Sequence, residues 1–586
     1  MATLMDIWCL LIDHKKEPIG TLFTVKISSD ADVNDLRAKV KEKRSVDTAG
    51  VDSARLIVWR CMDSTIIFDD EDPKTLKDQV SEAFSNQKLE VLRVSETIAD
   101  LKLSKEETLL VQMPEPIAVP TVAQAWKRKK HDEIMTPSKR TKTYEEEQDK
   151  NVEAAKKAPT PSQAASLRQF EHIQKGPGWV LNGRPAQRVG PPIGLYHPVF
   201  DEFKEKLKGD GEISLDVRRL VREFITASAS VYQTKEDRMK GIQHTLGKLV
   251  GGPLEKVVGE GFASDRVLLA ATNEWSAKIL ICEVKNEIGT GIVDPYTQAC
   301  LAYQRYSSDD DKYLPLRRKS YCPCIILAIA GPWLCVAGAV YTRAPIVQPL
   351  TGYEWTAPEC LFDDQSRLER MVHSLNAATC SFRTYYTSTL LKAIPAAEGM
   401  HGFPYISSYD GNTFSYVEQL GGNDAQVFKV NEGGVLRVVK FTTQYNEAAH
   451  RFLSEEIEGE SFAPALYHVS QRTFGGRRMV VMDYVDGESA FGRTLTEGHF
   501  DQLKKALERL HTKELVFGDL RTPNIILKKE HVMLIDFDWC GIDGKANYPI
   551  DLNSSAGWVT GVGPGEVMRK EHDDAMLQKL QLAEMV

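Results

Sequence analysis

The stretch GDLRTPNIILKKEHVMLIDFDW, Gly518–Trp539, places three side chains able to bind a metal ion between two apolar runs. Asn524 follows Asp519 by five residues, and Asp536 follows Asn524 by twelve, after the strand-like run VMLI. Taken singly, these residues have ordinary explanations as a turn former, a helix cap and a strand end. Their order and spacing are together typical of a loop that carries a base and a metal ligand, followed by a hairpin that returns a second ligand. The stretch therefore predicts a phosphoryl-transfer site.

A lysine and a glutamate upstream extend this pattern. Two strand-like runs surround the turn NEGG, residues 431–434, and Lys440 lies near the end of the second run. Glu447 lies one turn into the helical pattern QYNEAAHRFLSEEIEG that follows, where it could pair with Lys440. Lys440 alone is equally well explained as a surface residue of a strand, so the prediction depends on the whole set of residues.

From about Tyr405 onward, the sequence resembles the protein-kinase-like superfamily, which implies a bilobal fold that binds ATP and Mg²⁺. The resemblance implies that Asp519 is the catalytic base and that Arg521 replaces the lysine that usually follows it. It also implies binding roles for seven positions: Asn524 and Asp536 for Mg²⁺, Lys440 with its partner Glu447 for the phosphates, Gly422 in the glycine loop, and Asp483 and Val485 at the hinge.

Several residues depart from the kinase pattern. Phe517-Gly518 replaces the usual His-Arg, and Asp538 occupies a position where glycine is common. Only about ten residues separate Asp538 from Tyr548, which leaves a short activation segment for a peptide substrate. The sequence around Asp519 is also similar to that of antibiotic and choline phosphotransferases, so a small molecule remains an alternative acceptor of the phosphoryl group.

A second group of polar residues lies in the middle of the chain. The strand-like runs RVLLAA and AKILICEVK flank a turn; Asp265 opens the first, and Glu283 and Lys285 share one face of the second. Asp265 and Glu283 could bind Mg²⁺, with Glu236 on a preceding helix as a third acid, while Lys285 positions a nucleophile. The ordinary alternative is a solvent-facing ion pair on a strand.

This middle region resembles the PD-(D/E)xK restriction-endonuclease superfamily, through Asp265 and the sequence Glu283-Val284-Lys285. Gln298 and Tyr303 are similar to the polar helix residues that often follow that motif. The resemblance implies an α/β/α core with a mixed sheet, cleavage of DNA, Lys285 as a catalytic residue, and Asp265, Glu283 and Glu236 as metal ligands.

The first hundred residues predict a compact domain ordered strand, strand, helix, strand, strand, which resembles a ubiquitin-like β-grasp fold. Residues 114–190 are rich in Pro, Lys and Ala and predict a linker. The linker contains the basic clusters Lys127–Lys130 and Lys139–Lys142, which predict binding to a nuclear import receptor; a charge run without function is the alternative.

Composition limits the classes of protein to consider. The chain has 586 residues, a formal charge of −9 and ten cysteines without the dense spacing of a disulfide-rich fold. The N-terminus lacks the basic and apolar regions of a secretory signal. The apolar stretch Cys322–Tyr341 is broken by Gly331-Pro332, so it predicts two buried strands and no contact with a membrane.

The order of these regions resembles the Crinkler family of secreted effectors in its fungal form. We therefore expect a multidomain α+β protein with a ubiquitin-like header at 1–113, a linker at 114–190, a nuclease-like domain at 191–390 and a kinase-like domain at 400–586. The resemblance implies export without a recognisable signal peptide, action in the nucleus of a host cell, and host DNA, ATP and a host protein as partners. The alternative is a kinase fold that is inactive, or directed at small molecules, and serves as a binding scaffold.

Overall fold

A computed structural model gives the structure of the chain. It describes residues 3–584 apart from short gaps between 45 and 106, the segment 115–136, and residues at 257–265, 292, 359–363, 391–401, 423–424, 458 and 529–530. The chain divides into two compact units, Met1–Thr121 and Val122–Val586.

The N-terminal unit contains a five-stranded sheet in the order β2-β1-β5-β3-β4. Its strands are β1 (Leu4–Ile12), β2 (Phe23–Ser28), β3 (Ile57–Cys61), β4 (Leu89–Val91) and β5 (Thr108–Gln112), and its helices are α1 (Val33–Lys43), α2 (Pro73–Ser85) and α3 (Ile98–Leu101). Strand β1 pairs in parallel with β5, which puts the last strand in the centre of the sheet. Helix α1 buries Val33, Leu36 and Val40, spaced along one helical face, in the same core.

The C-terminal unit is built around a second five-stranded sheet in the order β12-β11-β10-β9-β8. The strands are β8 (Arg266–Ala271), β9 (Ser276–Lys285), β10 (Cys324–Ala330), β11 (Trp333–Tyr341) and β12 (Pro345–Trp355). Only the β9–β10 pairing within this sheet is parallel. Strands β10 and β11 confirm that Cys322–Tyr341 folds as two buried strands joined by a tight turn.

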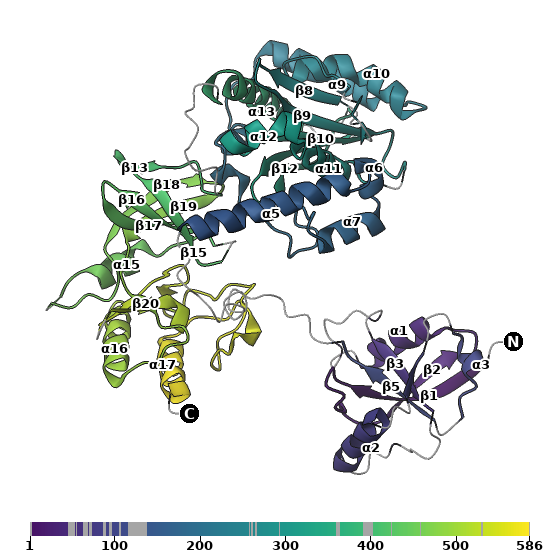
Figure 1. Cartoon of the computed structure of the whole chain (residues 1–586), viewed down its shortest axis with the longest axis vertical. Coiled ribbons are helices and arrows are strands. Elements are labelled where there is room, and N and C mark those ends of the chain that lie inside the picture. Colours follow the sequence, from purple (N-terminus) through teal and green to yellow (C-terminus); the bar gives the residue numbers. More distant parts are fainter. Residues whose placement is uncertain are drawn as a thin grey trace. The chain divides into compact units, whose positions relative to one another are not determined.

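Helices cover both faces of this sheet (Figure 1). Helices α9 (Leu215–Ala229), α10 (Lys235–Leu249) and α13 (Asp364–Thr384) lie on one side, and α11 (Pro295–Ser307) lies on the other. Helix α12 (Asp310–Lys319) follows α11 in the crossover between β9 and β10, and α8 (Val199–Lys208) packs against α13. A crossover between parallel strands requires such a helical connection, and it places α11 over the end of β9.

The prediction of a linker is wrong from residue 137 onward. The structure forms α5 (Pro137–Lys157), α6 (Pro161–Ala164) and α7 (Leu167–Lys175) there. Asn151 of α5 donates to the carbonyl oxygens of Pro177 and Trp179, and Gln148 donates to that of Thr342 in the sheet region. The polar composition misled the prediction because these polar side chains bond to backbone groups of the neighbouring sheet and loops.

The C-terminal region begins with a third sheet, in the order β15-β16-β17-β19-β18. Its strands are β15 (Ser415–Leu420), β16 (Val427–Glu432), β17 (Val435–Thr442), β18 (Leu466–Phe474) and β19 (Arg477–Asp483), and α15 (Glu447–Ser454) lies between β17 and β18. The hairpin β13 (Ser408–Tyr409) and β14 (Asn412–Thr413) precedes it. We refer to residues 402–483 as the small lobe.

The remaining residues form a second, more helical lobe. It contains α16 (Glu497–His511), α17 (Lys570–Glu584) and the short strands β20 (Glu488–Ser489), β21 (Leu515–Val516), β22 (Ile525–Lys528), β23 (His531–Leu534) and β24 (Gly541–Ile542). We refer to residues 484–584 as the large lobe. The hairpin of β22 and β23 separates Asn524 from Asp536 and brings both residues back to the same end of the hairpin.

Candidate functional site

Lys440 lies at the centre of the first candidate site, on β17 of the small lobe. Its Nζ atom lies 2.7 Å from Asp536 Oδ1 and 2.7 Å from Asp538 Oδ1, both in the large lobe. Burial alone would lower the pKa of Lys440, but the two carboxylates outweigh it and raise the pKa. The lysine is therefore charged and joins the two lobes at the site.

Asp519 lies in the loop before β22 and is buried. Arg521 holds it by a forked contact, in which Nη2 donates to Oδ2 at 2.7 Å and Nε donates to Oδ1. The side-chain amide of Asn524 donates to the backbone carbonyl of Asp519 at 3.0 Å. This bond occupies the amide nitrogen of Asn524 and makes its carbonyl oxygen the atom that could bind a cation.

Asp536 and Asp538 follow β23 in a tight bend. Asp536 has a φ of 73°, a left-handed conformation that Asp tolerates better than most residues. Burial and the Asp536 carboxylate raise the pKa of Asp538, whereas for Asp536 the Lys440 ammonium outweighs burial and lowers the pKa. Thr442 donates to Asp538 Oδ2 at 2.7 Å. Two carboxylates therefore share one ammonium group.

The predicted pair between Lys440 and Glu447 is wrong. Glu447 is the first residue of α15, and its carboxylate lies 3.0 Å from Arg451 and 3.7 Å from Arg478. The reason is competition, because Asp536 and Asp538 supply Lys440 with two carboxylates from the other lobe.

The remaining three predicted nucleotide-binding positions lie on the small lobe and just beyond it. Gly422 is exposed in the connection between β15 and β16. Asp483 ends β19 and is paired with Arg437, and Val485 follows it half-buried at the start of the large lobe. A paired Asp483 carboxylate is a less available polar contact for a ligand than the prediction assumed.

Asp573 of α17 is a functional candidate that the sequence did not indicate. It is 1% exposed, and its two carboxylate oxygens accept hydrogen bonds from the backbone N–H groups of Phe517 at 2.7 Å and Gly518 at 2.9 Å. These contacts fix the backbone directly before Asp519. The only signal in the sequence was an acidic residue on a helical pattern 54 residues further on, which is too common to interpret.

The second candidate site lies at the end of β9, against α11. Glu283 is 1% exposed, and its Oε2 atom accepts a hydrogen bond from Gln298 Nε2 at 2.7 Å. Gln298 Oε1 in turn accepts from Lys285 Nζ at 2.8 Å. The predicted acid, lysine and helix glutamine therefore form one chain of hydrogen bonds. Tyr303, by contrast, donates to the Cys322 carbonyl and belongs to the core.

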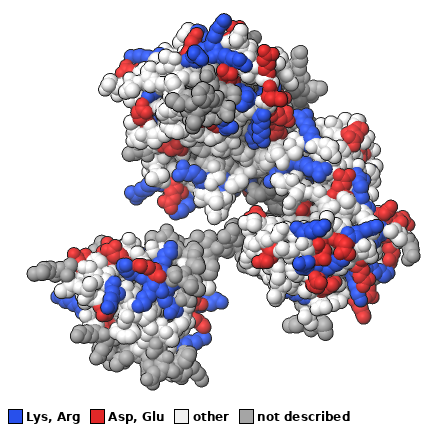
Figure 2. Space-filling view, turned by 180° about the vertical axis from the view of Figure 1, so that it is seen from behind, with Lys and Arg blue, Asp and Glu red and all other residues white. Residues whose placement is uncertain are grey.

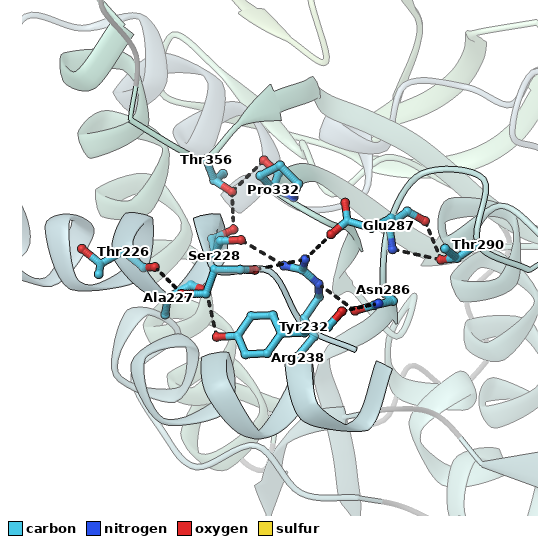
Figure 3. A network of polar contacts seen from close by, with 11 residues as sticks. Thr226, Ala227, Ser228, Tyr232, Arg238, Asn286, Glu287, Thr290, Pro332 and Thr356 are labelled. Carbon is cyan, nitrogen blue, oxygen red and sulfur yellow. Dashed lines mark hydrogen bonds and ion pairs between the residues drawn. The ribbon is translucent and has the colours of Figure 1, made fainter. Parts of the chain in front are cut away.

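The loop that follows Lys285 is anchored by the buried Arg238 of α10 (Figure 3). Arg238 donates to Glu287 Oε1 at 2.6 Å and to the Ser228 carbonyl at 2.9 Å, and Asn286 donates to the Tyr232 carbonyl at 2.8 Å. A buried guanidinium with several acceptors fixes the loop and the end of β9.

The predicted metal ligands of this second site are only partly assembled. Asp265 lies outside the described residues. Glu236 is exposed in the first turn of α10. Among the described residues, no group of three His, Cys, Asp or Glu side chains could hold a metal ion. Glu283 and Lys285 thus remain the core of this candidate.

The two predicted basic clusters differ in how far the structure describes them. Lys127–Lys130 lie outside the described residues, and Lys139–Lys142 fall in the first turns of α5. On the face shown in Figure 2, basic and acidic side chains are interspersed. In the described segments, no helix has the length and apolarity needed to cross a bilayer.

Comparisons with known proteins identify two regions. Residues 5–113 match the family described as the Crinkler effector protein N-terminal domain. A Caenorhabditis elegans protein named as a ribosomal protein S6 kinase alpha-2 is 29% identical over 172 residues, which is 26% of this chain and 21% of that protein. The ribosomal protein S6 kinase beta of the same organism is 23% identical over 180 residues, 28% of this chain and 31% of its own length.

Among solved structures, the Cydia pomonella granulovirus kinase PK-1 is 18% identical, covers 29% of this chain and 68% of its own, and has a TM-score of 0.23. The chain spans less than a third of the length of the two curated relatives. The family match and the two curated relatives show that the chain carries a Crinkler-type N-terminal domain and a region distantly similar to protein kinases.

Proposed function

We propose that the C-terminal region is a Mg²⁺-dependent phosphotransferase that uses ATP. The observation that carries the proposal is the convergence of Lys440, Asp536 and the Asp519–Asn524 loop, which come from both lobes. The distant similarity to two kinases supports it. A pure scaffold has no physical need to keep a buried lysine, a buried acid and an amide together at one site.

Each residue has a defined role in this proposal. Lys440 binds the phosphates of ATP, and Asp519, oriented by Arg521, accepts the proton of the attacking hydroxyl. The carboxylate of Asp536 and the side-chain oxygen of Asn524 are hard oxygen donors that fit Mg²⁺. When bound, Mg²⁺ neutralises charge that develops on the transferred phosphoryl group.

The pKa of Asp519 suits a catalytic base. Burial raises its pKa above the ordinary value, and the contact with Arg521 limits the rise. A base with a raised pKa takes up a proton more readily once the substrate is bound. The short segment between Asp538 and Tyr548 favours an acceptor that needs little peptide docking, either a small hydroxyl compound or a loop of a host protein.

The test is ATP turnover by the purified full chain with Mg²⁺. We expect Asp536→Ala to abolish turnover, since it removes a metal ligand and the partner of Lys440. Asp501→Ala, which removes an exposed acid on α16, is the matched control and should leave turnover unchanged. Undiminished turnover in Asp536→Ala would contradict the assigned role, and no turnover in either protein would favour the scaffold.

We also propose that the central sheet carries a metal-dependent nuclease that cleaves DNA. The hydrogen-bonded chain from Glu283 through Gln298 to Lys285 is the supporting observation, because it places a carboxylate and an ammonium group at one end of a buried strand. Glu283 would bind the metal ion and Lys285 would position the nucleophile. Asp265 and Glu236 would supply further carboxylate oxygens.

Incubation of the full chain with supercoiled DNA and Mg²⁺ tests this second function. We expect nicking that disappears in Glu283→Ala and persists in Glu274→Ala, which removes an exposed carboxylate from the turn before the same strand. Absence of nicking under a range of divalent ions would leave the central sheet without enzymatic activity.

The Crinkler-type N-terminal domain supports a proposal about location. We infer that the protein is an effector, exported by a route without a recognisable signal peptide, that acts in the nucleus of a host cell. Lys127–Lys130 would bind a nuclear import receptor, and host DNA or a host protein would be the target. Unchanged nuclear accumulation after replacement of these four residues by Ala would contradict the import role.

A further inference from the structure

Paired residues of the central sheet form two rows next to the Glu283–Lys285 site. Residues paired directly across strands point to the same face of a sheet, so each row lies on the face that bears Glu283 and Lys285. One row consists of Glu283, Ala328, Cys335 and Tyr353, and the next consists of Lys285, Ala330, Trp333 and Trp355. Helix α11 covers part of this face, because its Gln298 reaches both Glu283 and Lys285.

Each row ends in large aromatic side chains. Tyr353 and Trp355 are 40% and 41% exposed, although they lie on a sheet whose other strands are almost completely buried. The rings of Trp333 and Trp355 meet edge to face, with centroids 5.0 Å apart. We name Trp333, Tyr353 and Trp355 the aromatic strip.

Small residues separate the aromatic strip from the candidate site. Ala328 and Ala330 occupy the β10 positions between Glu283 or Lys285 and the aromatic side chains. A cavity of about 370 Å³ lies there, and its lining includes Lys285, Gly289, Ala330 and Tyr353. The cavity therefore extends from the lysine of the candidate site to Tyr353 of the aromatic strip.

The carboxylates around this cavity are engaged by other groups. Glu287 is paired with Arg238 at 2.6 Å. Asp294 caps α11 by accepting from the backbone N–H groups of Tyr296 and Thr297, and it also accepts from the Tyr353 hydroxyl at 3.1 Å. These contacts balance or disperse their negative charge, and Lys285 contributes its ammonium group to the same lining.

We propose that the aromatic strip binds the unpaired bases of a single-stranded nucleic acid whose backbone passes Lys285. This inference rests on the proposed nuclease function and adds its substrate class. Every base presents a π-face that stacks on Trp or Tyr, whereas a duplex hides these faces inside its stack. Three strand spacings, about 14 Å, separate Lys285 from Trp355, so the strip engages bases beside the phosphate near Lys285.

Binding is measured without cleavage by fluorescence anisotropy of the full chain with labelled oligothymidine in EDTA. We expect Trp355→Leu to weaken binding about tenfold and Trp355→Phe, which keeps an aromatic face, to stay close to the original chain. Trp8→Leu is the matched control, because Trp8 is also 41% exposed but belongs to the N-terminal unit. Melting temperatures of all variants establish that each one is folded.

The outcomes separate this inference from the nuclease proposal. Unchanged affinity in folded Trp355→Leu, or equal affinity of the original chain for single-stranded and duplex DNA, would overturn the inference. Absence of any nucleic-acid binding would also overturn it and would favour a protein partner for the strip. If oligothymidine binding by the original chain depends on Trp355 but no metal supports cleavage, the nuclease proposal alone has failed.

Discussion

At the scale of single residues, the contact of Lys440 with two carboxylates bears directly on the proposed binding of ATP. The Nζ atom is 2.7 Å from both Asp536 and Asp538, and only Asp536 has a ligand role in the proposal. In the proposed complex, Asp538 would therefore compete with the phosphates of ATP for the same ammonium group and add negative charge beside them. The residue common at this position in kinases, glycine, carries no such charge.

We predict that Asp538→Asn binds ATP in the presence of Mg²⁺ about three to ten times more tightly than the original chain, because a charged competitor for Lys440 is removed. Asparagine keeps an oxygen that can accept the hydrogen bond from Thr442. Isothermal titration calorimetry measures the change. Weaker binding in Asp538→Asn would instead identify Asp538 as an additional ligand of the metal.

His450 carries a second prediction at this scale. It is buried on α15, stacks on Phe537 with ring centroids 4.6 Å apart, and lies 2.6 Å from the Tyr445 hydroxyl and 2.7 Å from the Pro464 carbonyl. The carbonyl can only accept, so Nε2 carries the proton and Nδ1 accepts from Tyr445. Burial lowers the pKa of His450 to about 4.

This shift gives stability a defined dependence on pH. Between pH 4 and about 6.5 the unfolded chain binds a proton at this histidine and the folded chain does not, so the free energy of unfolding decreases as pH falls through that window. The expected loss is on the order of 3 kcal/mol. We expect His450→Gln to lose most of this dependence of the free energy of unfolding on pH, as measured by urea unfolding at a series of pH values. An equal slope in the variant would assign the effect to other groups.

Individual residues of the kinase-like site also differ in how well the sequence predicted their contacts. Order and spacing were sufficient to bring Lys440, Asp519, Asn524 and Asp536 together, because a loop and a hairpin of fixed length determine their separation. The partner of Lys440 could not be predicted in the same way. Glu447, Asp536 and Asp538 all carry a carboxylate that could pair with Lys440, and only the packed lobes decide which of them it contacts.

At the scale of elements, Arg238 connects α10 with the loop after β9. Its guanidinium is 1% exposed and bonds to Glu287, Asn286 and the Ser228 carbonyl. We predict that Arg238→Met lowers the free energy of unfolding by about 2–4 kcal/mol, because the Ser228 carbonyl loses a donor in a buried place. Urea unfolding measures the change.

Arg219→Met is the matched control for this prediction. It removes the same charge from the neighbouring helix α9, where Arg219 is 75% exposed and its ion pair with Asp216 contributes little. The two variants should therefore differ by most of the predicted loss. Equal stability of the two variants would show that solvent replaces the contacts of Arg238.

Elements were predicted unevenly from the sequence. Strands 266–271 and 277–285 were recognisable because they are apolar, bounded by turns and joined by a short connection. Strand β5, which lies in the middle of the N-terminal sheet, was missed because TLLVQ is short and far from its partner β1 in the sequence. Helix α5 was read as linker because its polar side chains bond to backbone groups that only the fold brings near.

At the scale of the molecule, the compact units differ from the predicted domains. Everything from Val122 onward forms one unit. Alternate residues of the small-lobe strands, among them Val439, Phe441 and Val481, belong to the same hydrophobic core as the central sheet, whereas Val480 and Met482 belong to the core with the large lobe. The sequence predicted two of these strands, around the turn at residues 431–434, but it did not reveal that both faces of their sheet are covered by protein.

Polar contacts support this shared core. Asp201 of α8, buried and with a pKa raised by burial, accepts a hydrogen bond from the backbone N–H of Gly475 at 2.6 Å in the turn between β18 and β19. A side chain on Gly194 would collide with Gly475, since its Cβ would lie 2.7 Å from the Gly475 Cα. The turn of the small lobe therefore packs directly against the central region.

We predict that residues 400–586, expressed alone, do not form a stable domain, whereas residues 122–586 fold and bind ATP. Separation exposes a set of small-lobe side chains that are now at most 1% exposed: Phe428, Val430, Val439, Phe441, Met479 and Val481. Each costs roughly 1.5–3 kcal/mol when returned to water, so their sum is comparable with the whole stability of a typical domain. Circular dichroism, binding of a hydrophobic dye and ATP titration compare the two fragments, with residues 1–121 as the control that should fold independently. A 400–586 fragment that unfolds cooperatively and binds ATP like the full chain would show that the small lobe does not depend on the central sheet.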